Sequence, residues 1–131
     1  MNNNETCIFC TPDDRDIHDI IDQNDLAYAR WDNFPAAEGH AEVIPRRHVE
    51  SFFQLSDDEV LAVYGLAKAA QYVISAKYKP EGFTIGVNDG LAAGRTVHHL
   101  HLHLIPRHFN DVPAPRGGIV QVLLGPGNSN H

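Results

Sequence analysis

The longest regular hydrophobic pattern in the chain runs over residues 57–78 and has the period of a helix. Apolar side chains recur there every three to four residues, which places them on one face of an α-helix: Val60, Val63, Tyr64, Ala67, Ala70, Ile74 and Tyr78. Ser56 precedes the run and Glu59 follows three positions later, which is the spacing of a capping box. Pro80 and Gly82 end the pattern. We predict one long helix over residues 57–78.

Elsewhere the apolar positions form short segments that are typical of β-strands. Pro35 and Gly39 mark a turn between the first two, which predicts a hairpin. The segments lie at residues 24–34, 40–44, 83–87, 96–106 and 119–124. Strands dominate and the helix is segregated from them, as in an α+β fold. We expect an antiparallel sheet of about five strands with one long helix.

Size and charge narrow the class of protein. The 131 residues suffice for one domain with one core, and we expect a single domain over 1–131, with a packed part at about 7–124 between flexible termini. The net charge of −7 argues against a nucleic-acid partner, because binding to a phosphate backbone needs a basic surface. No apolar run approaches the ~20 residues of a membrane span, and the N-terminus lacks the pattern of a secretory signal. We therefore expect no membrane partner and a cytoplasmic location.

The segment at residues 96–106 carries the strongest chemical signal. His99, His101 and His103 alternate with leucines, so a strand would place the three imidazoles on one face. Imidazole serves in proton transfer, nucleophilic attack and metal binding near neutral pH. Side chains two positions apart on a strand are roughly 6.5–7 Å apart at their roots, so three in a row converge poorly on one metal. We favour a division of functions, in which one imidazole attacks, another contacts the substrate and the outermost serves structure. A solvated polar face and a three-histidine metal site are the alternatives.

Two cysteines, Cys7 and Cys10, form a C-x-x-C pair near the N-terminus. A structural disulfide is not expected in a reducing cytosol. A thioredoxin-like redox pair follows a strand, whereas this pair precedes the first predicted strand, which disfavours a redox function. Half of a metal site and two ordinary thiols remain open.

The run from His99 to Ile105 resembles the His-φ-His-φ-His-φ-φ signature of the histidine-triad (HIT) family, in which φ is apolar. Two further segments are similar to family patterns: Gly39-His40 followed by residues 43–48, and Asn88 followed by Gly94-Arg95-Thr96. The resemblance covers roughly residues 7–108 and is greatest to bacterial members related to the dinucleoside polyphosphate hydrolase branch. It implies a HIT-like fold and pairing into a homodimer.

The resemblance also implies roles for individual residues. His101 would attack the α-phosphate of a nucleotide and form a nucleotidyl-histidine, which water then hydrolyses; this splits one difficult displacement into two easier ones. His103 would contact the phosphates, with His40 supporting it and His99 completing the catalytic cluster. The implied substrate contacts are Asp32 at the ribose, Phe34 and Ile44 near the base, Asn88 and Thr96 at phosphate oxygens, and Arg95, which stands where many members have glutamine. Roles in turns, in a strand or in the core are the alternative for these residues.

The two cysteines together with His48 and His99 would supply a Cys₂His₂ set, which suits a closed tetrahedral zinc site. The resemblance supports this set, because some bacterial HIT proteins and the related galactose-1-phosphate uridylyltransferases use one. Zinc would attach the N-terminal segment to the sheet and orient His99 beside the nucleophile. A metal-free pair of thiols with a surface His48 is the alternative.

The leading hypothesis is a nucleotide hydrolase that cleaves dinucleoside polyphosphates, such as diadenosine tetraphosphate, at the α-phosphate. A nucleoside phosphoramidase would cleave a P–N bond with the same residues. A nucleotidyltransferase would differ only in the acceptor that resolves the intermediate. Outside enzymes, the alternative is an adaptor that binds nucleotides without turnover, and the intact row of histidines argues against it.

Overall fold

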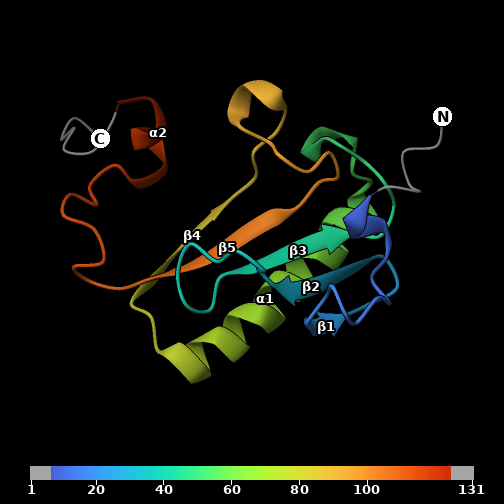
Figure 1. The fold of residues 1–131 in the computed structure, drawn as a ribbon, viewed down its shortest axis with the longest axis horizontal. Coiled ribbons are helices and arrows are strands. Elements are labelled where there is room, and N and C mark those ends of the chain that lie inside the picture. Colours follow the sequence, from blue (N-terminus) through green and yellow to red (C-terminus); the bar gives the residue numbers. More distant parts are fainter. Residues whose placement is uncertain (1–6, 125–131) are drawn as a thin grey trace.

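Five strands form one antiparallel sheet in the order β1-β2-β3-β5-β4 (Figure 1). The computed structural model describes residues 7–124, so the predicted flexible termini lie outside the described residues. The strands are β1 (Ile20–Gln23), β2 (Ala27–Trp31), β3 (Ala41–Pro45), β4 (Gly82–Gly86) and β5 (Leu102–Arg107). One long helix, α1 (Asp57–Tyr78), packs across one face of the sheet. The predicted α+β architecture is confirmed.

The helix α1 has the predicted bounds because its ends are set by local signals. The Ser56 hydroxyl accepts the Glu59 N–H at 3.1 Å, and the Glu59 carboxylate accepts the Ser56 N–H at 2.9 Å. These bonds satisfy backbone donors that an α-helix leaves free at its start. At the other end Lys79 adopts a left-handed conformation with φ of 51°, and Pro80 cannot continue the helix.

The main core lies between α1 and the sheet. Val63, Leu66, Ala70 and Ile74 of the helix are buried against a set of mostly small residues from β2, β3 and β5: Ala27, Ala29, Ala41, Val43 and Leu104. The alanines have short side chains, so the helix can pack closely on the strands. This packing leaves the opposite face of the sheet available for polar chemistry.

Replacement of Ile74 by alanine is expected to lower the free energy of unfolding by about 2–5 kcal/mol, because it leaves a cavity in the core. The Ile74 side chain is fully buried, whereas its neighbour Val73 is 39% exposed. Urea unfolding followed by circular dichroism measures the change. Val73→Ala is the matched control and should cost less than about 1 kcal/mol. Equal losses in the two variants would contradict this packing.

The predicted strand at residues 119–124 is wrong. The chain forms a 3₁₀ turn, η5 (Gly118–Val120), and a short helix, α2 (Gln121–Leu124). Gly117 and Gly118 have φ values of +91° and +51°, which turn the backbone out of an extended path. The apolar composition of this segment was therefore a misleading signal.

The edge strand β1 was not predicted from the sequence. Ile20 and Ile21 are half-buried while Asp22 and Gln23 are exposed, so the strand lacks the alternation that identifies a half-buried strand. It forms because it pairs with β2. The other strands lie within the predicted segments or within one residue of them, although the histidine strand begins only at Leu102.

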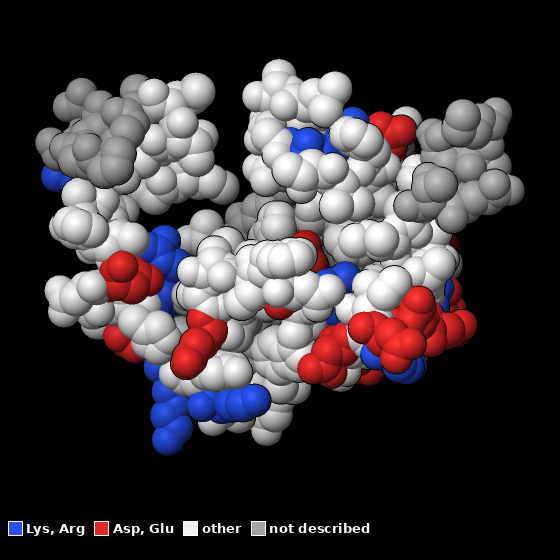
Figure 2. Space-filling view, in the orientation of Figure 1, with Lys and Arg blue, Asp and Glu red and all other residues white. Residues whose placement is uncertain are grey.

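Acidic side chains gather over β1 and its flanking loops, and basic ones lie near the end of α1, on the face drawn in Figure 2. This view shows no continuous basic surface, in keeping with the net charge of −7. Among the described residues, no helix has the length and apolar character needed to cross a membrane.

Candidate active site and metal centre

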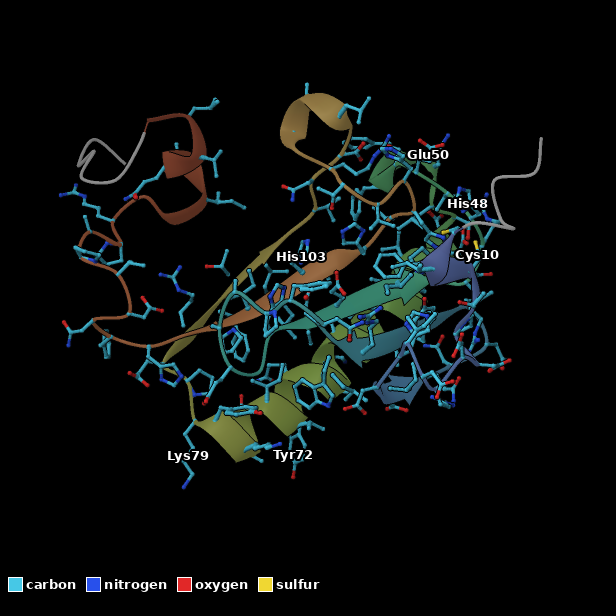
Figure 3. The ribbon with its side chains drawn as sticks, in the orientation of Figure 1. Cys10, His48, Glu50, Tyr72, Lys79 and His103 are labelled. Carbon is cyan, nitrogen blue, oxygen red and sulfur yellow. The ribbon has the colours of Figure 1, made fainter. Side chains whose placement is uncertain are left out.

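The candidate site lies on the sheet face opposite α1. Ala41 and Val43 of β3 point into the core beneath the helix, so alternation turns Glu42 to the other face. There Glu42 approaches His103 of β5 and His101 just before it. Figure 3 shows His103 over the sheet, away from Tyr72 and Lys79 on α1. The fold thus separates a packed face from one that carries the histidines and Glu42.

His101 is oriented by a backbone contact. Its Nδ1 lies 2.8 Å from the carbonyl oxygen of His99, and since a carbonyl only accepts, Nδ1 must carry the hydrogen. The other nitrogen, Nε2, is then left with a free lone pair. Burial lowers the pKa of His101, which keeps the ring neutral at pH 7. A neutral imidazole with an exposed lone pair is the form that a nucleophile requires.

A chain of hydrogen bonds fixes His103 in the opposite tautomer, with the hydrogen on Nε2. The Ala36 N–H donates to His40 Nδ1 at 2.9 Å, so His40 carries its hydrogen on Nε2 and donates to His103 Nδ1 at 2.9 Å. His103 therefore carries its own hydrogen on Nε2. Burial, with His101 and His40 nearby, lowers the pKa of His103 to about 4. Of the two neighbouring imidazoles, His101 thus presents a lone pair on Nε2 and His103 presents an N–H donor on Nε2.

A pocket of about 290 Å³ opens beside these two imidazoles. It brings together most of the predicted site: Asp32, Phe34, Asn88, Thr96, His101 and His103. Asp32 accepts the Phe34 N–H at 2.7 Å and approaches His40 Nε2 at 3.5 Å. Phe34 itself is 91% exposed, so its ring lies at the rim, where a planar base could stack on it.

Two predicted substrate contacts do not line this pocket. Ile44 is fully buried, in a small core cluster with Phe9 and Tyr28. Arg95 lines a neighbouring cavity of about 580 Å³. Its guanidinium is held there by the Glu50 carboxylate at 3.0 Å and by the Glu50 carbonyl at 3.3 Å. Side-chain packing and this ion pair decide both positions, and neither follows from the local sequence.

Two residues that the sequence analysis did not single out form the buried wall of the pocket. Arg30 and Glu42 line it, and their side chains are 2% and 6% exposed. The Arg30 Nη1 donates to His18 Nδ1 at 2.9 Å, and His18 Nε2 donates to the Ile8 carbonyl at 2.8 Å. The only available signal was Glu42 itself, a charged residue within an otherwise apolar strand.

Four potential metal ligands meet at the other end of the histidine row. Cys7, Cys10, His48 and His99 place one ligand atom each within 4.8 Å of all the others. Individual sulfur–Nδ1 distances are 3.3 Å for Cys7–His99, 3.4 Å for Cys10–His99 and 3.2 Å for Cys10–His48. Zinc bound tetrahedrally by sulfur and nitrogen would place these atoms about 3.6 Å apart. The residues therefore fit a Cys₂His₂ zinc site with only small adjustments.

The surroundings of these ligands also fit a metal. His99 Nε2 donates to the Pro45 carbonyl at 2.7 Å, so its Nδ1 lone pair faces the thiols, in the way that second-shell bonds orient metal ligands. Burial, together with the neighbouring Cys7 thiol, raises the pKa of Cys10 to about 11, and a cation would favour the thiolate instead. Figure 3 shows Cys10 and His48 close together at the opposite end of the sheet from β4.

Phe9 divides the histidine row into its two parts. Its ring packs edge-on against His99 at 6.0 Å and against His101 at 5.1 Å between ring centroids. The His99 ring lies on the side of His48, and its backbone carbonyl contacts His101. The structure thus places the His99 imidazole among the four potential metal ligands, and it does not line the pocket beside His101.

Comparison with known proteins agrees with this geometry. The family model described as "HIT domain" matches residues 16–110. An uncharacterized HIT-like protein of Mycoplasma genitalium is 37% identical over 108 residues, which are 82% of this chain and 77% of that protein. The adenosine 5′-monophosphoramidase of Schizosaccharomyces pombe is 33% identical, over 78% of this chain and 74% of its own. An AP-4-A phosphorylase of Mycobacterium tuberculosis is also 33% identical, but over 70% of this chain and 48% of its own.

Solved structures are similar as well. A HIT family protein from Bacillus anthracis has a TM-score of 0.74 and 32% identity, with 79% of this chain and 74% of that chain covered. A zinc-bound histidine triad family protein from Mycobacterium smegmatis has a TM-score of 0.73 and 27% identity, with coverage of 83% and 80%. The matched sequence, the shared fold and the histidine site lead to one conclusion: the chain belongs to the HIT domain family.

Proposed function

We propose that this protein hydrolyses dinucleoside polyphosphates, such as diadenosine tetraphosphate, at the α-phosphate through a nucleotidyl group on His101. The observation that carries the proposal is the 2.8 Å bond from His101 Nδ1 to the His99 carbonyl, which leaves Nε2 as a lone pair at the pocket. Relatives named as an AP-4-A phosphorylase and an adenosine 5′-monophosphoramidase support nucleotide chemistry at this site.

The reaction would proceed in two displacements. The Nε2 lone pair of His101 forms a bond to the α-phosphorus while the bond to the bridging oxygen breaks, and the leaving phosphate takes that electron pair. The positive charge on the imidazole is stabilised by the His99 carbonyl at Nδ1, and the His103 N–H would donate to a non-bridging oxygen. Water then attacks the phosphorus, displaces His101 and releases the mononucleotide and a proton.

The second cavity favours a substrate with two nucleosides over a phosphoramidate with a small leaving group. It shares Ile8, Thr96 and Val97 with the catalytic pocket and extends away from His101. Leu91 lines it and is 70% exposed, so an apolar surface is available to a second base. A polyphosphate that passes Thr96 could thus occupy both cavities at once.

A substrate panel combined with adduct trapping tests the proposal. Purified protein is mixed with diadenosine tri- and tetraphosphate and with adenosine phosphoramidates, quenched within milliseconds and digested for mass spectrometry. We expect an adenylyl group on His101 and a higher kcat/KM for the dinucleotides. A phosphoramidase would show the reverse preference. Tight nucleotide binding with neither adduct nor turnover would instead indicate an adaptor.

We further propose that Cys7, Cys10, His48 and His99 hold a structural zinc ion. The sulfur–nitrogen distances of 3.2–3.4 Å and the zinc-bound relative from Mycobacterium smegmatis support this assignment. Bound zinc would neutralise the two thiolates and join the N-terminal segment to the sheet. It would act on catalysis only indirectly, since the backbone of His99 holds His101.

A homodimer is the third part of the proposal. An apolar groove of about 430 Å³ lies between α1 and the strands β4 and β5, and β4 is an edge of the sheet. Exposed apolar side chains line this groove, among them Phe52, Val60, Tyr64 and Ile85. An edge strand beside an apolar surface is suited to pairing with a second copy of the chain.

The variant Ile85→Asp is expected to be a monomer under conditions in which the parent is a dimer. Ile85 is 54% exposed on the edge strand, and a buried unpaired carboxylate at an interface is costly. Sedimentation equilibrium measures the molecular mass of the parent and of the variant. Leu61→Asp is the matched control, because Leu61 is 68% exposed on α1 and does not line the groove. A dimeric Ile85→Asp protein would place the interface elsewhere.

A further inference from the structure

Glu42 is a buried carboxyl group inside the candidate nucleotide pocket, and the two displacements described above do not use it. Its Oε2 lies 4.0 Å from His101 Nε2 and 3.9 Å from His103 Nδ1. The side chain is 6% exposed. An α-phosphate in reach of His101 would therefore come within a few ångströms of this carboxyl group.

The groups around Glu42 disfavour a negative charge there. His101 Nε2 presents a lone pair, and His103 Nδ1 already accepts from His40. Neither nitrogen offers a hydrogen to a carboxylate, so the contacts at 3.9 and 4.0 Å are not ion pairs. The charge of the Asp32 side chain also acts against a negative charge on Glu42.

Arg30 is an ion-pair partner of Glu42, but two of its donor nitrogens bond to other groups. Its Nε donates to the Trp31 carbonyl at 3.2 Å and its Nη1 donates to His18. The distance from Arg30 Nε to Glu42 Oε1 is 3.6 Å, which is too long for a hydrogen bond. Arg30 therefore offsets the burial of the carboxyl group only in part.

We propose that Glu42 is a further active-site residue, which works as a neutral carboxylic acid and donates a hydrogen bond to an oxygen of the nucleotide beside His101. This inference rests on the proposed attack by His101.

The titration of Glu42 gives the inference a measurable consequence. Burial first, and then the charge of Asp32, raise the pKa of Glu42 to about 8, while Arg30 lowers it. The charged or titratable groups that face Glu42 are Arg30 and Asp32 from β2 and the turn after it, and His101 and His103 from the β5 segment. Below pH 8 the acid form predominates. Above pH 8 a carboxylate would repel the α-phosphate, so kcat/KM should fall about tenfold per pH unit.

The test compares the pH dependence of kcat/KM for the parent, Glu42→Gln and Glu42→Leu, with diadenosine tetraphosphate as substrate. Glutamine keeps the size and a donor but cannot ionise, so Glu42→Gln should stay within about threefold of the parent at pH 7 and lose the fall above pH 8. Leucine removes the donor and should lower kcat/KM about tenfold at pH 7. A Glu42→Gln profile that falls in parallel with the parent would overturn the proposal.

A second readout does not depend on turnover. Protein labelled with ¹³C at the glutamate side-chain carboxyl groups is titrated by NMR. The resonance that is absent from the spectrum of Glu42→Gln belongs to Glu42, and in the parent it should titrate near pH 8. Titration below pH 6 would overturn the proposal, even if adenylyl-His101 forms normally. The absence of any adduct or turnover in the parent protein would instead refute the proposed function, whatever Glu42 does.

Discussion

Replacement of His101 by alanine is expected to lower kcat/KM for diadenosine tetraphosphate by at least about 10⁴-fold, because removal of an enzyme nucleophile leaves only binding and electrostatic effects. The same variant should form no covalent adduct. His101 is 7% exposed and donates one hydrogen bond to the His99 carbonyl, so circular dichroism is needed to show that the variant is folded. Steady-state kinetics and mass spectrometry of quenched reactions measure the two effects.

His108 provides the matched control for this variant. It is also a histidine, it lies seven positions later, and it is exposed and in contact with Glu81, outside both cavities. His108→Ala should keep kcat/KM within about threefold of the parent and should still form the adduct. Turnover by His101→Ala at the parental rate would rule out the covalent mechanism, and an adduct on another histidine would reassign the nucleophile.

Replacement of Cys10 by serine is expected to abolish stoichiometric zinc binding and to lower the melting temperature by more than about 10 °C. A free zinc concentration one thousand times Kd contributes about 4 kcal/mol to stability, and serine is a poor zinc ligand. In a domain of this size each kcal/mol corresponds to a few degrees. Elemental analysis gives the metal content, and calorimetry with and without a chelator gives the stability.

The zinc prediction extends to catalysis through His99. Its imidazole belongs to the proposed metal centre and its carbonyl orients His101, so Cys10→Ser should also lower kcat while it leaves the adduct site unchanged. His108→Ala serves again as control and should keep one zinc ion per chain. A parent protein that contains no zinc, and whose melting temperature is unaffected by a chelator, would remove the metal assignment.

The parts of the fold that follow from local rules were predictable. The helix α1 has the predicted bounds of residues 57–78 because its capping box, its period and its terminal proline act within a few positions. Two segments were predicted wrongly because strand pairing is not visible in the local sequence: the edge strand β1 was missed, and residues 119–124 were predicted as a strand. Ile20 and its neighbours become a strand only beside β2, whereas the glycines at 117 and 118 keep the last apolar segment out of the sheet.

Most residues that line the candidate pocket were predictable from the sequence, but their arrangement was not. The pocket does gather His101, His103, Asp32, Asn88 and Thr96, although their chemical roles stay predictions until they are tested. Arg95 is drawn away by Glu50, and Ile44 is buried in the core. The wall formed by Arg30 and Glu42 was missed, because a charged residue in a strand reveals its burial only when neighbouring strands surround it.

By itself, the sequence determined the helix, the antiparallel class and the chemistry available, since these depend on residue type and on spacing over a few positions. Only the tertiary structure decided how the three histidines divide. Phe9, which is distant in the chain, separates His99 from His101, and β3 brings Glu42 up to His101. These contacts depend on strand register and burial, which arise from parts of the chain that meet only after folding.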